Sequence, residues 1–264
     1  MNITQIRNAT LILKYAGTTF LIDPMLADKE SEPGFPGTPR SHLRNPLVSL
    51  PVSVEELMNV DAIIVTHTHS DHWDEAAQNA VPKDMTIFTQ NESDAALLNS
   101  QGFLNVHALD DENNIKGITL IKTDGQHGTD EAYANPEMAT LLGDACGLVF
   151  SHPEEKTLYI AGDTIWVKPY EDALKKHQPD VVVLNAGFAQ TDDFGPIIMG
   201  KEDILRTQQE LPSAMIVASH MEAVNHCILS RAELRAFTEE KAIEKNVFIP
   251  QDGETLTFWT CIPE

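Results

Sequence analysis

Residues 65–76, VTHTHSDHWDEA, concentrate three histidines and two aspartates directly behind the apolar stretch DAIIVT. The five side chains are His67, His69, Asp71, His72 and Asp74. Imidazole nitrogen and carboxylate oxygen suit Zn²⁺, Mn²⁺ or Fe. A polar loop with satisfied hydrogen bonds is the alternative, but the H-x-H-x-D-H spacing at the C-terminal end of a predicted strand favours a metal site.

The spacing within the motif favours two metal ions over one. His67 and His69 are two residues apart, so in an extended turn both can point at one ion. Asp71 and His72 continue the loop and can face a second ion beside it. The stretch contains no cysteine, which excludes the usual closed structural zinc sites.

Composition limits the class of protein. Apolar residues make up 42% of the 264 residues, and the longest apolar runs, AIIV and VVVL, are too short to span a membrane. No secretory signal is visible at the N-terminus, so we expect a cytoplasmic protein with no membrane partner. Cys146, Cys227 and Cys261 are odd in number and widely spaced, which predicts core thiols rather than disulfides.

The charge balance argues against a nucleic-acid partner. Eighteen basic and forty acidic residues give a net charge of −22, and no segment gathers Lys and Arg into a stripe. The acidity is best explained by solubility. No coiled-coil heptad marks an interface, and the sequence leaves a homo-oligomer open.

The order of apolar strands and capped helices predicts a mixed α/β chain. A hairpin is expected around Ala16-Gly17, helices with S-x-x-E capping boxes begin after Ser53 and Ser230, and strands alternate with helices between them. No linker or repeat interrupts the pattern, so we predict one domain over residues 1–264. Residues 27–51 form a proline-rich insert, either a lid or a subunit interface.

Beyond these patterns, THTHSDH resembles the signature of the metallo-β-lactamase superfamily. His127 in DGQHGT, Asp163 in YIAGDT and His220 in IVASHME follow in the order of that family's remaining ligands. The resemblance spans nearly the whole chain and implies a four-layer αβ/βα sandwich with two divalent transition-metal ions, Zn, Mn or Fe, at one edge.

The resemblance also implies a role for each matching residue. One ion would be held by His67, His69 and His127. The other would be held by Asp71, His72 and His220, with Asp163 bridging. Asp71 would in addition orient the attacking water, and Asp23, at the end of the strand FLID, would support the metal-site loops.

The late segment SHMEAVNH contains two histidines, and the sequence favours His220 as the ligand because it follows the strand directly. Glu222, Asn225 and His226 are then candidates for contact with substrate. Helix-start polarity is an equal explanation for these three residues. In the insert, Arg44 and His42, together with Arg40, could grip an anionic group, and we expect a small anionic substrate.

The start LIDP, the insert behind it and AGDT look most like the L-ascorbate-6-phosphate lactonase-like branch. His69 replaces the acid of flavodiiron-type carriers, and the tRNA-processing and mRNA-cleaving branches are disfavoured because no basic exosite is present. The resulting expectation is a metal-dependent hydrolase of a small ester or lactone, phosphorylated or not. A phosphodiesterase and a non-catalytic metal-binding protein are the alternatives.

Overall fold

The strands form two large sheets. A computed structural model gives the structure, which describes residues 1–259. Within that range the first sheet contains seven strands in the order β16 (Thr255–Thr257), β1 (Asn2–Arg7), β2 (Thr10–Tyr15), β3 (Thr18–Ile22), β4 (Ala62–Val65), β5 (Ile87–Thr89) and β6 (Val106–Ala108). The second, also of seven described strands, runs β15 (Val247–Phe248), β14 (Met215–Ser219), β11 (Val181–Asn185), β10 (Leu158–Ile160), β9 (Cys146–Ser151), β8 (Ile118–Asp124) and β7 (Glu112–Ile115).

Both sheets change from antiparallel to parallel pairing part of the way across. The predicted hairpin pairs β2 with β3, and β3, β4, β5 and β6 then run parallel. In the second sheet β7 to β10 are antiparallel, whereas β10, β11, β14 and β15 are parallel. Because parallel strands end at the same edge, the segments that follow β3, β4, β10 and β14 can meet there.

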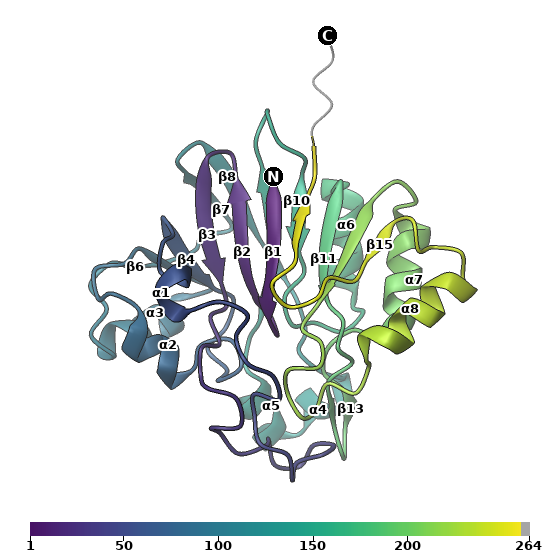
Figure 1. Ribbon diagram of the computed structural model, residues 1–264, viewed down its shortest axis with the longest axis horizontal. Helices are drawn as coiled ribbons and strands as arrows, with labels where there is room; N and C mark the ends of the chain where they lie inside the picture. The colour runs from purple at the N-terminus through teal and green to yellow at the C-terminus, as the bar shows by residue number, and fades with distance from the viewer. Residues whose placement is uncertain (260–264) are drawn as a thin grey trace.

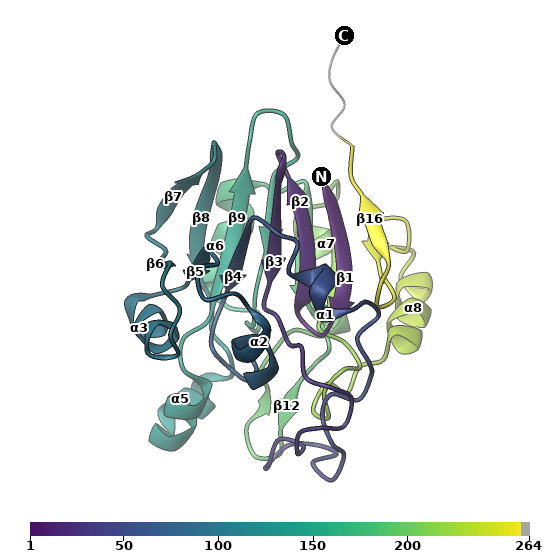
Figure 2. The ribbon, with the colours of Figure 1, turned by 60° about the vertical axis from the view of Figure 1, so that its left-hand side comes forward.

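Helices cover the outer face of each sheet (Figures 1 and 2). The first sheet is covered by α1 (Val54–Leu57), α2 (Glu75–Ala80) and α3 (Glu92–Ser100), and the second by α6 (Lys168–His177), α7 (Lys201–Glu210) and α8 (Arg231–Glu240). The capping boxes at Ser53 and Ser230 are both formed, as predicted. Two further short helices, α4 (Asp130–Ala134) and α5 (Pro136–Leu142), lie at the lower edge in Figure 1.

Three apolar clusters hold the layers together. The central one joins the two sheets, with Leu13 and Phe20 from the first and Phe150 and Val183 from the second. The others pack α1 to α3 on the first sheet and α6 to α8 on the second. In β4 all four residues are buried, with Ala62 and Ile64 facing the central cluster and their neighbours facing the helices. The predicted four-layer sandwich is therefore confirmed.

Several elements were not predicted from the sequence. They are β1, β7, α4, α5 and the small ribbon of β12 (Gln190–Thr191) and β13 (Gly195–Pro196). In β1, NITQIR, the buried positions include the polar side chains Gln5 and Arg7. The sequence therefore lacks the alternation of apolar and polar residues that would predict a strand. Cys146 and Cys227 are buried free thiols, as expected, and Cys261 lies outside the described residues.

The insert at 27–51 crosses the lower edge and is fastened by two buried side chains. Arg7 donates to the carbonyl oxygens of Met25, Ala27 and Val48 at its two roots. Asn225 binds its middle: the side-chain oxygen accepts from the Phe35 amide at 2.9 Å, and its nitrogen donates to Thr38 Oγ1 and Pro39 O at 2.9 and 2.8 Å. These contacts connect the two roots and the middle of the insert to the rest of the chain. Among residues 1–259, no helix is long and apolar enough to cross a membrane.

Candidate metal centre and pocket

The predicted ligands come together where strands of both sheets end. His67 follows β4, His127 follows β8, Asp163 follows β10 and His220 follows β14. Three groups of side chains each bring their ligand atoms within 4.8 Å of one another. They are His67, His69 and His127; His67, His72 and Asp163; and Asp71, His72 and His220. The first and third groups match the two ligand sets implied by the resemblance, and Asp163 lies between them.

The ring nitrogens on the inner side of the cluster are close together. His67 Nε2 lies 3.1 Å from His69 Nδ1, and His72 Nε2 lies 3.2 Å from His220 Nε2. The Oδ2 atom of Asp163 is 3.2 Å from His72 Nε2, 3.6 Å from His127 Nε2 and 3.7 Å from His220 Nε2. One carboxylate oxygen is therefore shared among rings from both sheets, as a bridging ligand requires.

The outer ring nitrogens of three of the histidines hydrogen-bond to groups outside the set of ligands. His127 Nδ1 donates to Ile197 O at 2.9 Å and His69 Nε2 to Leu141 O at 2.9 Å. His72 Nδ1 donates to Asp23 Oδ2 at 2.9 Å. A ring that donates outward presents its other nitrogen as a lone pair, which is how proteins orient metal-binding histidines. The donor set therefore fits transition-metal ions, and the described residues contain a cluster able to hold them.

Buried carboxylates hold positive charge in the cluster. Burial alone would lower the pKa of His72, but the carboxylates of Asp163, Asp23 and Asp71 raise it to about 10. Burial opposes ionisation of Asp163 too, yet the rings of His72, His220 and His127 keep its pKa well below the usual range. His127, with fewer carboxylate neighbours, has a pKa lowered to about 4, mainly by burial. Bound cations would take the place of the protons.

Asp23 hydrogen-bonds to the loop that carries the ligands. Its Oδ1 accepts from the Thr66 amide and its Oδ2 from Thr66 Oγ1, both at 2.7 Å, and Oδ2 also accepts from His72. The residue lies at the end of β3 with φ +46, which turns its side chain beneath the loop that carries the ligands.

Sequence reasoning missed three side chains around the cluster. Asn8, in the turn between β1 and β2, donates to Asp71 O at 3.0 Å and lies 3.2 Å from His220 Nε2. Asn185 donates to Asp163 Oδ1 at 2.6 Å, and Cys227 Sγ lies 3.3 Å from His220 Nδ1. Asn8 has a positive φ of +53, which asparagine tolerates better than most residues.

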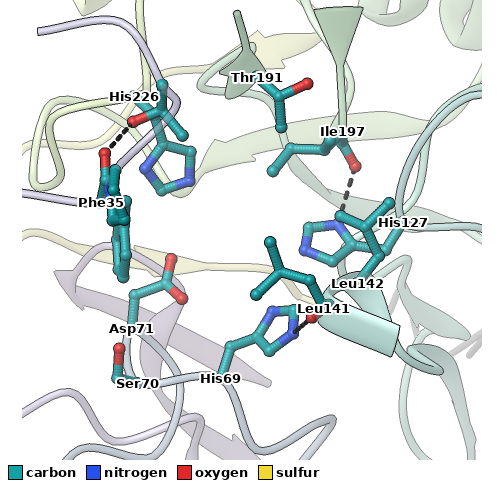
Figure 3. Close-up of a pocket in the computed structure, with 12 residues that line it drawn as sticks. Phe35, His69, Ser70, Asp71, His127, Leu141, Leu142, Thr191, Ile197 and His226 are labelled. Atoms are coloured by element: carbon teal, nitrogen blue, oxygen red, sulfur yellow. Dashed lines mark hydrogen bonds between the residues drawn. The ribbon is translucent and has the colours of Figure 1, made fainter. Parts of the chain in front are cut away.

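A cavity of about 320 Å³ opens directly onto the cluster (Figure 3). The insert and α5 face each other across it, and the cluster forms one side. Most of its surface is apolar, and none of the residues that line it in the described chain is Lys or Arg. The lining residues are Phe35, Pro36, Thr38, His69, Ser70, Asp71, His127, Leu141, Leu142, Thr191, Ile197 and His226.

The structure separates the predicted substrate-binding residues. His226 lines the cavity, whereas the side chain of the neighbouring Asn225 does not line it and hydrogen-bonds to the backbone of the insert. Glu222 forms an ion pair with Arg231 at 2.8 Å. Arg44 is exposed and donates to Glu30 O and Ser31 O, two carbonyl oxygens of the same insert. Neither Arg44 nor the exposed His42 lines the cavity.

The anion grip placed on Arg44 is therefore not found at this cavity. Arg40, the third member of that cluster, donates to the Asn225 and Cys227 carbonyl oxygens. Both arginines stabilise the insert, because their guanidinium groups donate to backbone oxygens and do not line the cavity.

Comparison with known proteins identifies the family. A family profile described as Beta-lactamase superfamily domain matches residues 18–221. The Bacillus subtilis UPF0173 protein YddR is 51% identical over 98% of this chain and 100% of its own. The resemblance to the lactonase-like branch receives no support from these matches.

Two solved structures have nearly the same fold. An isothiocyanate hydrolase from Delia radicum gut bacteria is 64% identical, with a TM-score of 0.97 and coverage of 98% of this chain and 99% of its own. A possible metal-dependent hydrolase from Veillonella parvula is 48% identical, with a TM-score of 0.96 and the same coverage. The metallo-β-lactamase prediction is confirmed, and this chain belongs to the UPF0173 family of metal-dependent hydrolases within that superfamily.

Proposed function

We propose that this protein hydrolyses small, neutral organic isothiocyanates, R–N=C=S, in a metal-dependent reaction. The small apolar cavity against the His/Asp cluster carries the proposal, because it can bury an uncharged R group and hold an electrophilic carbon beside the cluster. The 64% identical isothiocyanate hydrolase supports the choice of substrate.

A small neutral ester or lactone is the second candidate. It carries an electrophilic carbon of similar size, and the same apolar wall would accept its alkyl part. A phosphorylated or otherwise anionic substrate fits less well, because Arg44 and Arg40 donate to backbone oxygens outside the cavity. The same argument disfavours a phosphodiesterase.

The residues that would hold two divalent transition-metal ions are those of the cluster: His67, His69 and His127 for one, Asp71, His72 and His220 for the other, and Asp163 between them. Such a pair supplies a lowered pKa for water and electrostatic attraction on the electrophile.

Asp71 is the side chain best placed to act on the water. It lines the cavity and also belongs to the cluster, with Oδ2 3.2 Å from His220 Nε2. Burial opposes its ionisation, but His72 and His220 keep the pKa of Asp71 well below its ordinary value. The ionised carboxylate accepts a hydrogen bond from a water molecule at the cavity floor and fixes the direction of its lone pair. Phe35, Leu141 and Leu142 keep other water away from the reacting carbon.

A direct assay tests the proposal. Purified, metal-loaded protein is mixed with benzyl isothiocyanate, and the loss of isothiocyanate and the formation of benzylamine are followed against the same protein treated with chelator. Chelator-sensitive release of benzylamine is expected. Chelator-sensitive hydrolysis of γ-butyrolactone or p-nitrophenyl acetate, with no release of benzylamine, would replace the isothiocyanate by the second candidate. Metal binding without any turnover would instead support the non-catalytic alternative.

A further inference from the structure

His226 occupies the cavity wall without a hydrogen-bond partner. Its side chain is buried, with 6% of the residue exposed, and lines the cavity together with Asp71 and His69. The Nδ1 atom is enclosed and unpaired, and neither ring nitrogen makes a hydrogen bond within residues 1–259. A buried polar group without a partner is costly, and because Nδ1 is enclosed, Nε2 is the ring nitrogen that remains open to a molecule in the cavity.

The ring is held in place by its neighbours rather than by polar contacts. Phe35 packs against it edge to face, with ring centroids 4.8 Å apart and an interplanar angle of 85°. The preceding residue, Asn225, is fastened to the insert, and the His226 carbonyl accepts from the Gln190 amide at 3.3 Å. Figure 3 shows the ring on the same side of the cavity as Asp71, across from His127.

Burial also fixes the charge of the ring. Desolvation lowers the pKa of His226 to about 4, so the imidazole is neutral near pH 7. A neutral imidazole has one nitrogen that donates and one that accepts. With the proton on the enclosed Nδ1, the accessible Nε2 can take up a proton from a molecule in the cavity and return it.

The reaction proposed above requires a proton to be moved in this way. When water adds to R–N=C=S, its oxygen bonds to the central carbon and one proton goes to nitrogen, which gives the thiocarbamic acid R–NH–C(=O)–SH. Breaking the C–N bond then releases O=C=S, and the remaining acidic proton moves to nitrogen as the bonding pair returns to it, leaving R–NH₂. Both protons of the water finish on the amine.

Resting on the proposed function, we infer that His226 is the catalytic residue that carries the second proton to the leaving nitrogen. The ring accepts the thiocarbamic proton and delivers a proton to the nitrogen as the C–N bond breaks. It ends the cycle neutral, as it began.

A series of para-substituted phenyl isothiocyanates tests this assignment. Electron-rich amines need the proton before they leave, whereas p-nitroaniline needs it far less. His226→Phe is expected to lower kcat roughly 10²- to 10⁴-fold for the p-methoxy substrate and much less for the p-nitro substrate. His226→Gln can still hydrogen-bond to a molecule in the cavity but cannot carry a proton. It should show the same graded loss if His226→Phe folds poorly.

Leu141→Ala provides the matched control, because Leu141 lines the same cavity without a titratable group. Its effect should be uniform across the series. Metal content of the His226 variants should equal that of wild type, and their thermal midpoint should not fall below it. A loss of kcat in these variants that is equal for all leaving groups, or no loss, would overturn the role of His226 but leave the proposed function intact. Failure of wild type to release any amine overturns the proposed function and this inference with it.

Discussion

Asp163 is the single side chain on which both halves of the cluster depend. Its Oδ2 atom lies within 4 Å of four histidine rings, and its Oδ1 accepts from Asn185. Asp163→Asn keeps the shape but removes the charge, which costs about 1.5–3 kcal/mol for a charged contact. Metal affinity should therefore fall at least roughly tenfold.

Metal analysis by plasma mass spectrometry after gel filtration measures this effect. Wild type should retain close to two ions per chain, and Asp163→Asn clearly fewer. Asp193→Asn, an exposed aspartate outside the cluster, serves as the control and should match wild type. Equal metal content in wild type and Asp163→Asn would rule out the bridging role.

At the scale of elements, Asn225 is expected to hold the insert in place more strongly than Arg44 does. Asn225→Ala leaves the Phe35 amide and the Pro39 carbonyl without their buried partner, which should lower the free energy of unfolding by at least about 2 kcal/mol. It should also raise KM, because Phe35 and Thr38 belong to the cavity wall. Thermal unfolding and steady-state kinetics measure both effects.

Arg44→Ala is the matched variant within the same insert. Its exposed guanidinium contacts only backbone oxygens of the insert in the described structure, so stability should change by less than about 0.5 kcal/mol and KM should stay constant. A tenfold rise in KM for Arg44→Ala would instead support the sequence-based prediction that Arg44 binds an anionic group of the substrate.

Phe35 separates the cavity from a larger neighbouring groove of about 890 Å³, since Phe35, Pro36 and Ser70 line both. Phe35→Ala should join the two spaces. The ratio of kcat/KM for naphthylmethyl over methyl isothiocyanate is then expected to rise about tenfold, which corresponds to one or two methylene-sized contacts. An unchanged ratio would show that the partition does not limit substrate size.

At the scale of the whole molecule, the cluster joins the two sheets. His67 and His72 come from the first sheet, and His127, Asp163 and His220 from the second. Metal binding should therefore stabilise the folded chain by about 2.7 kcal/mol when free metal is 100 times its Kd. For a chain of this size that is a rise in Tm of roughly 5–10 °C.

Thermal unfolding with and without chelator, followed by addition of Zn²⁺ or Mn²⁺, tests this linkage. The chelated protein should melt at lower temperature and recover on addition of metal. A thermal midpoint that is the same in both states would mean that the cluster binds no metal in the folded chain.

Much of the fold and the candidate cluster could be predicted from the sequence because both depend on local order. Apolar runs such as AIIV must be buried strands, and the ligands follow strand ends in a fixed sequence. Asn8 could not be predicted, since its partners Asp71 and His220 lie 63 and 212 residues away along the chain. Cys227 lies only seven residues from His220, but a lone cysteine in a loop does not indicate which side chain it contacts. Arg44 was misjudged because position in a loop does not say which way a side chain points.

The insert is fastened mainly through its backbone. Arg7 binds only carbonyl oxygens of the insert and its roots, and Asn225 binds the Phe35 amide and the Pro39 carbonyl. Every residue type except proline offers both of these groups. Side chains at positions 35 and 36, which take no part in these bonds, can therefore be exchanged while the path of the chain is kept. Mutations at these few positions can therefore change the substrate range without changing the fold of the insert. This makes the insert side of the cavity a suitable place for new selectivity to evolve and for mutant libraries that select for it.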